Sequence, residues 1–524
     1  MTAPKPDIVF IITDQQRYDT IAALGASHMD TPNIDRLVTT GVSFEQCHVT
    51  APSCVPCRAS LFTGYYPHTN GVLANGQPWS RTWVSDLARA GYHCVNIGKM
   101  HTIPYDAKAG FHERYVVENK DRYMEGRWFF DEWDKALASH GLKKQQRETY
   151  RKRPDYKDRL GAFTWDLPAA LQSDNFIGET TCWWLETKPV DKPLFLTIGF
   201  PGPHPPYDPT PEMAEKYMAR DVPLPEVSDE ELAALAAPWI EKRQHDVEVD
   251  HDSVAWKLKP TQEELKRMRA YYYANMEMID TQVGHILDAL EARGNMDNTI
   301  VIFTSDHGDN LGDHGLSQKW APYDAVTRVP MIVSAPGRFE GGREVSEMVQ
   351  LFDLGPTILE WAGVTPDASF EAESLNPVLE GKPFDGRSHV FCEQAGDVNM
   401  TGASYLTMVR STSHKLVHFN GSEAGQLFDL VADPGERVNL WDDPVHAADK
   451  QALLEQIAAQ VHLSPRSLQR KLADEGTNYS ALLEASREEL ARAYLAGGTH
   501  TVSEVTFLLG FSDVSAFFEE AGAR

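Results

Sequence analysis

Two cysteines, a proline and an arginine lie close together near the start of the chain and could carry chemistry. Residues 53–64 read SCVPCRASLFTG, which places Cys54, Pro56 and Arg58 at alternate positions. An arginine is planar and always charged, so Arg58 suits an anionic ester held beside a nucleophile. Cys54 and Cys57 also have the spacing of a redox pair or of half a zinc site, although Cys-x-x-Cys alone is a weak signal. The other four cysteines are scattered, so no second pair completes a zinc site.

Acids and an imidazole follow two predicted strands. Residues 7–13 form a continuous apolar run, which is typical of a buried parallel strand, and Asp14 comes directly after it. Residues 298–304 predict a second such strand, and Asp306 and His307 follow it. Open α/β sheets bind ligands at this edge, and two carboxylates with an imidazole suit a hard-to-borderline divalent cation. A helix N-cap is the competing interpretation of Asp14.

Basic side chains follow two further predicted strands. Lys99 and His101 come after a strand at 92–97, and His204 comes after a strand at 193–200. A lone lysine is usually a solvated surface charge, and a loop histidine is often merely packed. The positions of these residues at strand ends favour a functional role instead.

Together these segments resemble the sulfatase family. Cys54-x-Pro56-x-Arg58 with Thr63-Gly64 is similar to the sulfatase signature, in which the first cysteine is oxidised after synthesis to formylglycine. The resemblance implies that Cys54 becomes an aldehyde hydrate held by Arg58. One hydroxyl of the hydrate would attack sulfur or phosphorus, and loss of a proton from the other would expel the product as the aldehyde re-forms. The resemblance covers roughly residues 7–444.

The same resemblance implies a full set of site residues. Lys99 and His101 would hold the non-bridging oxygens and the nucleophile, whereas His204 and Lys319 would reach the leaving oxygen. Asn75 and Thr102 are expected to bind substrate. The implied catalytic residues are Cys54, Arg58, Lys99, His101, His204 and Lys319, and the implied metal ligands are Asp14, Cys54, Asp306 and His307.

Two positions depart from the usual sulfatase pattern. Gln15 stands where most members have a second acid, and His307 stands where most have asparagine. Both changes resemble the phosphonate monoester hydrolase branch of the alkaline phosphatase superfamily. Gln15 could coordinate through its carbonyl oxygen, but it is not counted among the four core ligands. Calcium is the family default, and manganese is the alternative because an imidazole tolerates a softer metal.

The bulk composition limits the other classes of function. A net charge of −27 argues against a nucleic-acid surface, although a metal and a few bases can dominate one cleft. Six cysteines in 524 residues do not form a disulfide framework. The first residues lack the regions of a signal peptide, and no apolar run is long enough to span a bilayer. We therefore expect a cytoplasmic protein without a membrane partner.

The order of the predicted elements indicates an α/β fold. We expect an alkaline-phosphatase-like sandwich, with a large mostly parallel sheet flanked by helices, a small C-terminal antiparallel sheet and a helical tail. A helix is predicted at 270–293, and short strands at 390–393, 405–410, 415–419 and 426–430. Residues 111–191 show no motif and predict an irregular insertion over the cleft. The expected divisions are a catalytic domain at 1–380, an antiparallel subdomain at 381–445 and the tail at 446–524.

The tail resembles a different family. Residues 463–472 and 502–518 are similar to the paired helix-turn-helix of arabinose-type transcription regulators, but the second unit stops short of that family's ending. Acidic residues outnumber basic ones in the tail, which makes DNA binding a poor expectation. A helical packing or dimerisation element is the preferred interpretation. A transcription regulator and a redox protein are the two alternatives that are not hydrolases.

The sequence therefore predicts a metal-dependent hydrolase of sulfate monoesters, aryl esters foremost, that acts through a formylglycine hydrate and has promiscuous activities. Phosphonate monoester or phosphodiester hydrolysis as the main activity is the alternative. The expected partners are a small anionic ester and a formylglycine-generating maturation enzyme, without nucleic acid. We also expect a homo-oligomer, a dimer or a tetramer.

Overall fold

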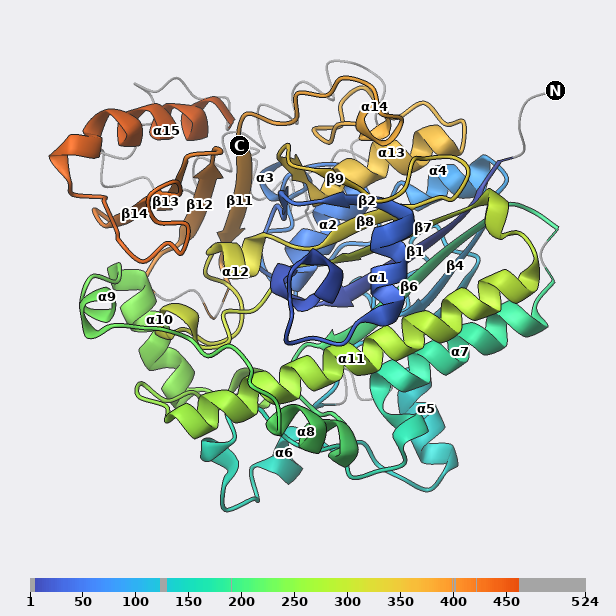
Figure 1. Ribbon diagram of the computed structural model, residues 1–524, viewed down its shortest axis with the longest axis horizontal. Helices are drawn as coiled ribbons and strands as arrows, with labels where there is room; N and C mark the ends of the chain where they lie inside the picture. The colour runs from blue at the N-terminus through green and yellow to red at the C-terminus, as the bar shows by residue number, and fades with distance from the viewer. Residues whose placement is uncertain are drawn as a thin grey trace, which may run out of the picture.

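An eight-stranded sheet forms the centre of the protein (Figure 1). The computed structural model describes residues 5–122, 130–189, 191–397, 399, 402–420 and 422–460. The strand order is β5-β4-β6-β1-β7-β8-β2-β9, and the pairs from β5 to β7 are parallel, which confirms the predicted mostly parallel sheet. The strands are β1 (Asp7–Asp14), β2 (Gly41–Phe44), β4 (His93–Gly98), β5 (Glu113–Val116), β6 (Leu194–Pro203), β7 (Thr299–Ser305), β8 (Met331–Ser334) and β9 (Arg343–Val345).

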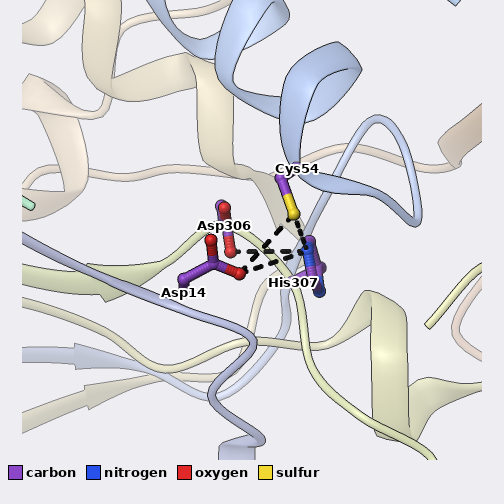
Figure 2. A group of neighbouring side chains, drawn as sticks. All are labelled: Asp14, Cys54, Asp306 and His307. Carbon is purple, nitrogen blue, oxygen red and sulfur yellow. Dashed lines mark hydrogen bonds and ion pairs between the residues drawn. The ribbon is translucent and has the colours of Figure 1, made fainter. Parts of the chain in front are cut away.

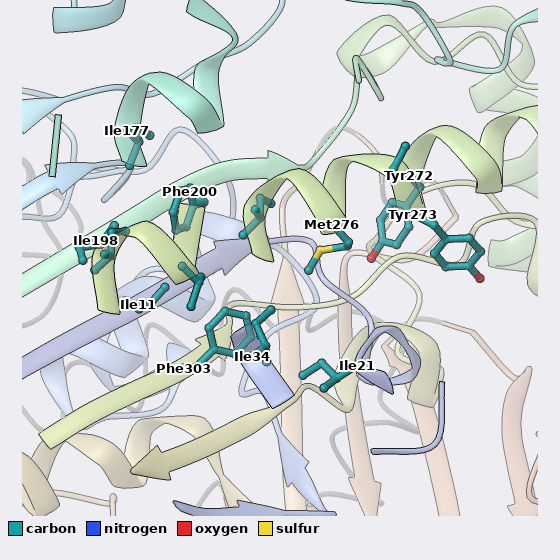
Figure 3. Close-up of a cluster of buried hydrophobic side chains, with 14 of the residues drawn as sticks. Ile11, Ile21, Ile34, Ile177, Ile198, Phe200, Tyr272, Tyr273, Met276 and Phe303 are labelled. Carbon is teal, nitrogen blue, oxygen red and sulfur yellow. The ribbon is translucent and has the colours of Figure 1, made fainter. Parts of the chain in front are cut away.

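Helices cover both faces of this sheet. On one face α11 (Gln262–Arg293) and α7 (Ser173–Thr187) lie side by side, and α1 (Pro32–Thr40) packs next to them (Figure 1). Figure 3 shows Met276 of α11 above Ile11 of β1 and Phe303 of β7 in the apolar core of that face. The other face is covered by α2 (Cys54–Thr63), α4 (Val84–Arg89) and α13 (Leu354–Trp361).

The long helix α11 begins earlier than the sequence pattern predicts. Its start is fixed by a capping box, in which Thr261 accepts from the backbone of Glu264 and the Glu264 side chain accepts from the backbone of Thr261. Its end is Gly294, which has a left-handed φ of 80°. The first two turns are mostly polar, with only Leu265 and Met268 as apolar residues, so the apolar pattern is clear only from residue 270 onward.

The prediction of an irregular segment at 111–191 was wrong in two places. β5 forms an edge strand of the large sheet, and α7 is a regular helix packed against α11. The buried face of α7 holds Ile177, Trp184 and Leu185, but polar and glycine residues interrupt its apolar period. These residues are Ser173, Asp174, Gly178 and Thr181. A Cβ at Gly178 would overlap the side chain of Gln282 on α11, so the close contact of the two helices requires glycine there.

A smaller four-stranded antiparallel sheet follows the large one. Its strands are β11 (Val390–Ala395), β12 (Tyr405–Arg410), β13 (His414–Asn420) and β14 (Gly425–Asp429), as predicted, and α15 (Ala447–Gln460) covers it (Figure 1). The predicted helix-turn-helix segments at 463–472 and 502–518 lie outside the described residues. Across the described ranges, no helix is long and apolar enough to cross a membrane.

Short elements connect these layers. Two strands, β3 (Cys47–His48) and β10 (Val349–Gln350), form a separate parallel pair. The remaining α-helices are α3 (Pro67–Asn70), α5 (Glu132–Ser139), α6 (Arg147–Tyr150), α8 (Pro211–Met218), α9 (Asp229–Ala233), α10 (Ala237–Glu248), α12 (Asp324–Thr327) and α14 (Asn376–Leu379).

A buried ion pair joins α3 to the small sheet and predicts a pH-dependent stability. His68 of α3 lies with Nδ1 2.9 Å from Glu393 Oε1 on β11 and Nε2 3.8 Å from Glu371 Oε1. Burial opposes the charged imidazole, but Glu393 and then Glu371 outweigh it and raise the pKa of His68 to about 8. The raised pKa stabilises the fold fully below the unfolded-state pKa of about 6.5, and this contribution is lost as the pH rises through 8.

We therefore expect the free energy of unfolding to fall by about 2 kcal/mol between pH 6.5 and pH 9 because of this group. Urea unfolding of wild type and His68→Asn across that range measures it, with metal content held constant. The difference between the two proteins should shrink as the pH rises. A difference that stays constant over the range would mean that His68 carries no proton in the folded protein.

Candidate active site

Four neighbouring parallel strands deliver charged side chains to one edge of the large sheet. Asp14 ends β1, Asp306 follows β7, His204 follows β6 and Lys99 follows β4. The register of β1 and β7 pairs Thr13 with Ser305, so the two acids emerge next to each other. Lys99 Nζ lies 2.5 Å from Asp14 Oδ2, and the backbone N–H of His204 donates to the Asp14 carbonyl oxygen at 3.1 Å.

The N-terminus of α2 brings Cys54 to the same edge. Pro56 lies in the first turn, where its missing N–H costs the helix no hydrogen bond. Ser53 makes no side-chain cap, and Asn75 instead accepts from the Val55 backbone N–H at 3.1 Å. The side-chain oxygen of Asn75 therefore holds the start of α2. That Asn75 also binds substrate, through its side-chain NH₂ group, stays a prediction.

Four side chains converge on one point (Figure 2). Cys54 Sγ lies 3.1 Å from His307 Nε2 and 3.6 Å from Asp14 Oδ1, and His307 Nε2 lies 3.6 Å from Asp306 Oδ1. One donor atom from each of the four lies within 4.8 Å of all the others, and all four side chains are buried. The structure thus brings together the four residues that the sequence resemblance implies as metal ligands.

The protonation states of this group fit a bound cation. His307 Nδ1 lies 2.9 Å from the Gly308 carbonyl, so Nδ1 carries the proton and the Nε2 lone pair points at the cluster. Burial lowers the pKa of His307 and keeps the ring neutral. Burial would raise the pKa of Asp14, but Lys99 and other nearby cations hold it well below the usual range. An ionised carboxylate, a second carboxylate and a neutral imidazole are suitable ligands for a divalent metal.

Arg58 fixes the second carboxylate of the cluster. Its Nε donates to Asp306 Oδ2 at 2.6 Å, and its Nη1 donates to the Lys99 carbonyl at 3.0 Å. Its Nη2 lies 3.9 Å from Asp14 Oδ2 and, among the described residues, is buried without a hydrogen-bond partner. A buried guanidinium N–H without a partner is costly, and an anion entering the site could satisfy it.

Lys319 and Gln15 are bonded to each other beside Cys54. Lys319 Nζ donates to Cys54 Sγ at 3.1 Å and to Gln15 Oε1 at 3.0 Å. The carbonyl oxygen considered above as an additional metal ligand is therefore bonded to Lys319. Gln15 has a left-handed φ of 71°, and its Nε2 donates to Asp309 Oδ2 at 2.6 Å. Sequence reasoning missed Asp309, which also accepts from the Tyr207 hydroxyl at 2.8 Å and so holds the Gln15 side chain in place.

His101 lies beyond Lys99 in a strained conformation. Its φ is 63°, its backbone N–H donates to Glu118, and its carbonyl accepts from Trp79 Nε1 at 2.7 Å. Strain of this kind persists where the surroundings fix it, and it is common at functional sites. Burial, reinforced by the Lys99 charge, lowers the pKa of His101 well below its usual value, so the ring is neutral. Its Nδ1 is buried without a hydrogen-bond partner in the part of the chain that the structure describes.

Thr102 faces a different set of groups. Its hydroxyl donates to the Tyr105 carbonyl at 3.3 Å and accepts from Arg114 Nη1 at 3.0 Å. Tyr105 lies in the loop after β4 and Arg114 lies on β5, and none of the described contacts joins this hydroxyl to the Cys54 cluster. Its predicted role in substrate binding stays a prediction.

His204 is paired with an acid that sequence reasoning missed. His204 Nε2 lies 3.4 Å from Asp252 Oδ2, and Nδ1 lies 2.6 Å from the Pro205 carbonyl oxygen. Asp252 sits in the short 3-10 turn η5 (His251–Ser253), where its own φ is 51° and that of Ser253 is 64°. No motif marks this polar stretch, and only the fold places it beside β6. Burial and then Lys319 lower the pKa of His204, and Asp252 opposes that shift.

The two cysteines of the motif do not have the properties of a redox pair. Both are buried, and Cys57 Sγ donates to the Asp306 carbonyl at 2.7 Å. Burial raises the pKa of the Cys54 thiol to about 12 and that of Cys57 well above its usual value. Redox-active pairs need an accessible thiolate of low pKa. This environment therefore argues against the redox alternative.

Family models match three parts of the chain. The Sulfatase model matches residues 6–364, and the model described as N-sulphoglucosamine sulphohydrolase, C-terminal, matches residues 312–462. A helix-turn-helix domain model matches residues 457–522, nearly all of which lie outside the described residues. The first match covers more than half of the chain, including the whole Cys54 cluster.

Individual proteins are similar over most of their length. An arylsulfatase from Clostridium perfringens is 30% identical over 463 residues, which are 83% of this chain and 90% of the relative. The multifunctional alkaline phosphatase superfamily protein PehA of Trinickia caryophylli is 29% identical, over 85% of this chain and 93% of the relative. The crystal structure of a phosphonate monoester hydrolase from Agrobacterium radiobacter aligns with a TM-score of 0.72 at 25% identity, covering 90% of this chain and 96% of that one.

Proposed function

Because the chain belongs to the sulfatase family of the alkaline phosphatase superfamily, we propose that it hydrolyses sulfate monoesters, aryl sulfates foremost, at the Cys54 cluster. The observation that carries the proposal is the position of Cys54. Its side chain lies between the buried group Asp14, Asp306 and His307 and the ammonium of Lys319. A nucleophile needs these neighbours when it attacks a negatively charged ester.

The proposal includes oxidation of Cys54 to formylglycine by a separate formylglycine-generating enzyme. The hydrated aldehyde supplies one hydroxyl as the nucleophile and a second whose deprotonation expels the sulfate. Cys54 is buried at the N-terminus of α2, so any nucleophile at this position is held rigidly by the helix. A serine at the same position could attack but could not release the product in this way.

A single divalent metal, Ca²⁺ or Mn²⁺, is part of the proposal. Asp14, Asp306, His307 and the oxygen that replaces Cys54 Sγ would hold it, and it would supply positive charge that polarises the nucleophile and neutralises the ester oxygens. Arg58 keeps Asp306 in place, and the Gly308 carbonyl keeps His307 in the ligating tautomer. These supporting contacts are typical of metal sites, whose ligands are themselves hydrogen-bonded.

The remaining cations surround the space that the ester group would occupy. Lys99 contacts Asp14 and Lys319 contacts Cys54. Within the described part of the chain, Arg58 Nη2 and His101 Nδ1 are buried without a hydrogen-bond partner. Preorganised donors stabilise charge that develops in the transition state more than they stabilise the substrate. We assign Lys99, His101 and Arg58 to the non-bridging oxygens and the nucleophile, and His204 and Lys319 to the leaving oxygen.

Hydrolysis of phosphonate monoesters is the second candidate. Gln15 and His307 favour it as departures from the usual sulfatase pattern, and a phosphonate monoester hydrolase is among the similar structures. Both ester classes present a tetrahedral monoanion, so the charges around Cys54 accept either. The deciding experiment compares kcat/KM for phenyl sulfate and for the phenyl ester of phenylphosphonate, which share a leaving group. We expect the sulfate to react faster, and a clear preference for the phosphonate would make the second candidate the main activity.

The assignment of His204 predicts a dependence on the leaving group. His204→Ala should lower kcat/KM for aryl sulfates with poor leaving groups by ~10²–10⁴-fold, which is the usual contribution of a general acid. Esters with good leaving groups need less help and should lose much less. A series of substituted phenyl sulfates measures the difference as the slope of log kcat/KM against leaving-group pKa. An equal loss across the series would reduce His204 to a residue that only positions the substrate.

Asp252 gives this test a matched second variant. Asp252→Asn keeps the shape of the η5 turn but removes the charge that favours a proton on His204. Asp252→Asn should steepen the slope of log kcat/KM against leaving-group pKa, but by less than His204→Ala does. In the double variant the two effects should not add, because both act through one imidazole. Fully additive losses would show that Asp252 acts independently of His204.

A further inference from the structure

A second group of metal-ligating side chains lies far from Cys54 in the sequence, where α15 meets the small sheet. It consists of His414, the first residue of β13, His446, which ends the 3-10 turn η9 (Pro444–His446), and Asp449 in the first turn of α15. One donor atom from each lies within 4.8 Å of the other two. Among the described residues, only this group and the Cys54 cluster meet that criterion.

Two of the donor separations are close to those of a tetrahedral metal site. Asp449 Oδ2 lies 3.2 Å from His446 Nδ1 and 3.8 Å from His414 Nε2. Zinc bonds of ~2.0–2.1 Å at tetrahedral angles place neighbouring ligand atoms ~3.3 Å apart. The longer separation, between His414 and Asp449, exceeds the length of a hydrogen bond. A cation bound between the two side chains would bridge it. In the Cys54 cluster, His307 Nε2 lies 3.1 Å from Cys54 Sγ and 3.7 Å from Asp14 Oδ1.

The surroundings orient these side chains before any metal arrives. His414 Nδ1 lies 3.0 Å from the Ser413 hydroxyl, which leaves Nε2 to face Asp449. Asp443 caps the η9 turn by accepting from the Val445 backbone N–H at 2.9 Å, and so holds the turn that carries His446. Metal-binding histidines are commonly fixed in this way through their other ring nitrogen.

A second carboxylate stands beside the three donors. Asp429 of β14 is the direct cross-strand partner of His414, so the two side chains share one face of the sheet. Its Oδ1 accepts from the backbone N–H groups of Val431 and Ala432, which fixes the carboxylate next to the group. Two carboxylates with two imidazoles would balance the charge of one divalent cation.

We propose that His414, His446 and Asp449 bind a zinc ion. Two imidazole nitrogens and one carboxylate oxygen are typical zinc ligands, whereas calcium and magnesium prefer oxygen ligands alone. The side chains are 21%, 22% and 45% exposed, so the ion can enter from solvent and keep a water in its fourth position. The bound ion would tie β13 to the start of α15, whose Leu453 and Ile457 already pack on the small sheet.

The test measures zinc binding to the full-length protein by competition with a chromophoric chelator. Wild type should bind one zinc ion in addition to any metal held by the Cys54 cluster, and His446→Ala should bind this additional ion at least ~10-fold more weakly or not at all. Zinc should also raise the melting temperature of wild type by more than it raises that of His446→Ala. Turnover of aryl sulfates should be the same in both proteins, since the site lies outside the Cys54 cluster.

Three further variants make the result specific. Asp449→Asn keeps the size of the side chain and should weaken zinc binding in the same way, which covers the case in which His446→Ala folds poorly. His389→Ala removes another surface imidazole of the same subdomain, one that also contacts the serine before it, and should bind zinc like wild type. Asp306→Ala disrupts the other cluster and should retain this zinc ion. Equal zinc stoichiometry and affinity in wild type, His446→Ala and Asp449→Asn would overturn the proposal.

Discussion

Replacing Cys54 by alanine is expected to lower kcat/KM for aryl sulfates by at least ~10⁴-fold, the range seen when a covalent nucleophile is removed. The variant should keep its fold, because the substitution removes one sulfur atom from a well-packed helix N-terminus. Its melting temperature should therefore stay within a few degrees of wild type. Steady-state kinetics with thermal unfolding of the same samples separates lost chemistry from lost structure.

Cys57→Ala is the matched control for this prediction. Cys57 lies one turn further along α2 and is equally buried, but its sulfur donates to the backbone carbonyl of Asp306 and not to a side chain of the cluster. The control should keep most of its turnover. Equal losses in the two variants would mean that the motif is structural and would remove Cys54 from the mechanism.

The modification itself has a direct readout. After coexpression with a formylglycine-generating enzyme, the peptide that contains Cys54 should have lost its sulfur and gained an oxygen, while Cys57 keeps its thiol. Peptide mass spectrometry distinguishes the two positions by fragmentation. Fully active protein with an intact thiol at Cys54 would contradict the proposed nucleophile.

The convergence of the site residues on one edge of the sheet could be predicted from the sequence, because each residue lies next to a local strand pattern. Each of Asp14, Lys99, His204 and Asp306 lies at or just beyond the end of a segment whose sequence is typical of a buried strand. Parallel strands of one sheet end at the same edge, so the four side chains had to meet if the four strands were neighbours. The strand order β4-β6-β1-β7 supplies that condition.

The supporting groups could not be predicted in the same way. Asp252 reaches His204 from a turn with two consecutive left-handed residues, and no spacing rule connects positions 204 and 252. Asp309 resembles an ordinary loop acid until Gln15 and Tyr207 are seen to converge on it. Polar and glycine residues interrupt the apolar pattern on the buried face of α7, so a search for apolar periodicity misses that helix. In each case the deciding contact joins segments whose proximity only the tertiary fold creates.

The second large effect is expected at Asp306. This carboxylate accepts from Arg58 Nε at 2.6 Å and from the Gln15 backbone N–H at 3.1 Å, and its Oδ1 lies 3.6 Å from His307 Nε2. Removing its charge should abolish stable metal binding and reduce turnover by ~10³-fold or more, since a metal at this position supplies several kcal/mol of charge stabilisation. Asp306→Asn is preferable to Asp306→Ala, because the amide oxygen can still accept from Arg58 and spares the protein an unpaired buried guanidinium.

Metal content and turnover must fall together for this interpretation to hold. Elemental analysis of dialysed protein gives the first quantity, and aryl sulfate kinetics on the same sample gives the second. Asp309→Asn is the control, because it removes a buried charge three residues further along the same segment but outside the four-residue cluster. Asp309→Asn should keep its metal even if the contact between Gln15 and Lys319 is weakened and turnover declines. Normal turnover in a metal-free sample of wild type would contradict metal dependence, because the charge on the ester would then be stabilised by Arg58, Lys99 and Lys319 alone.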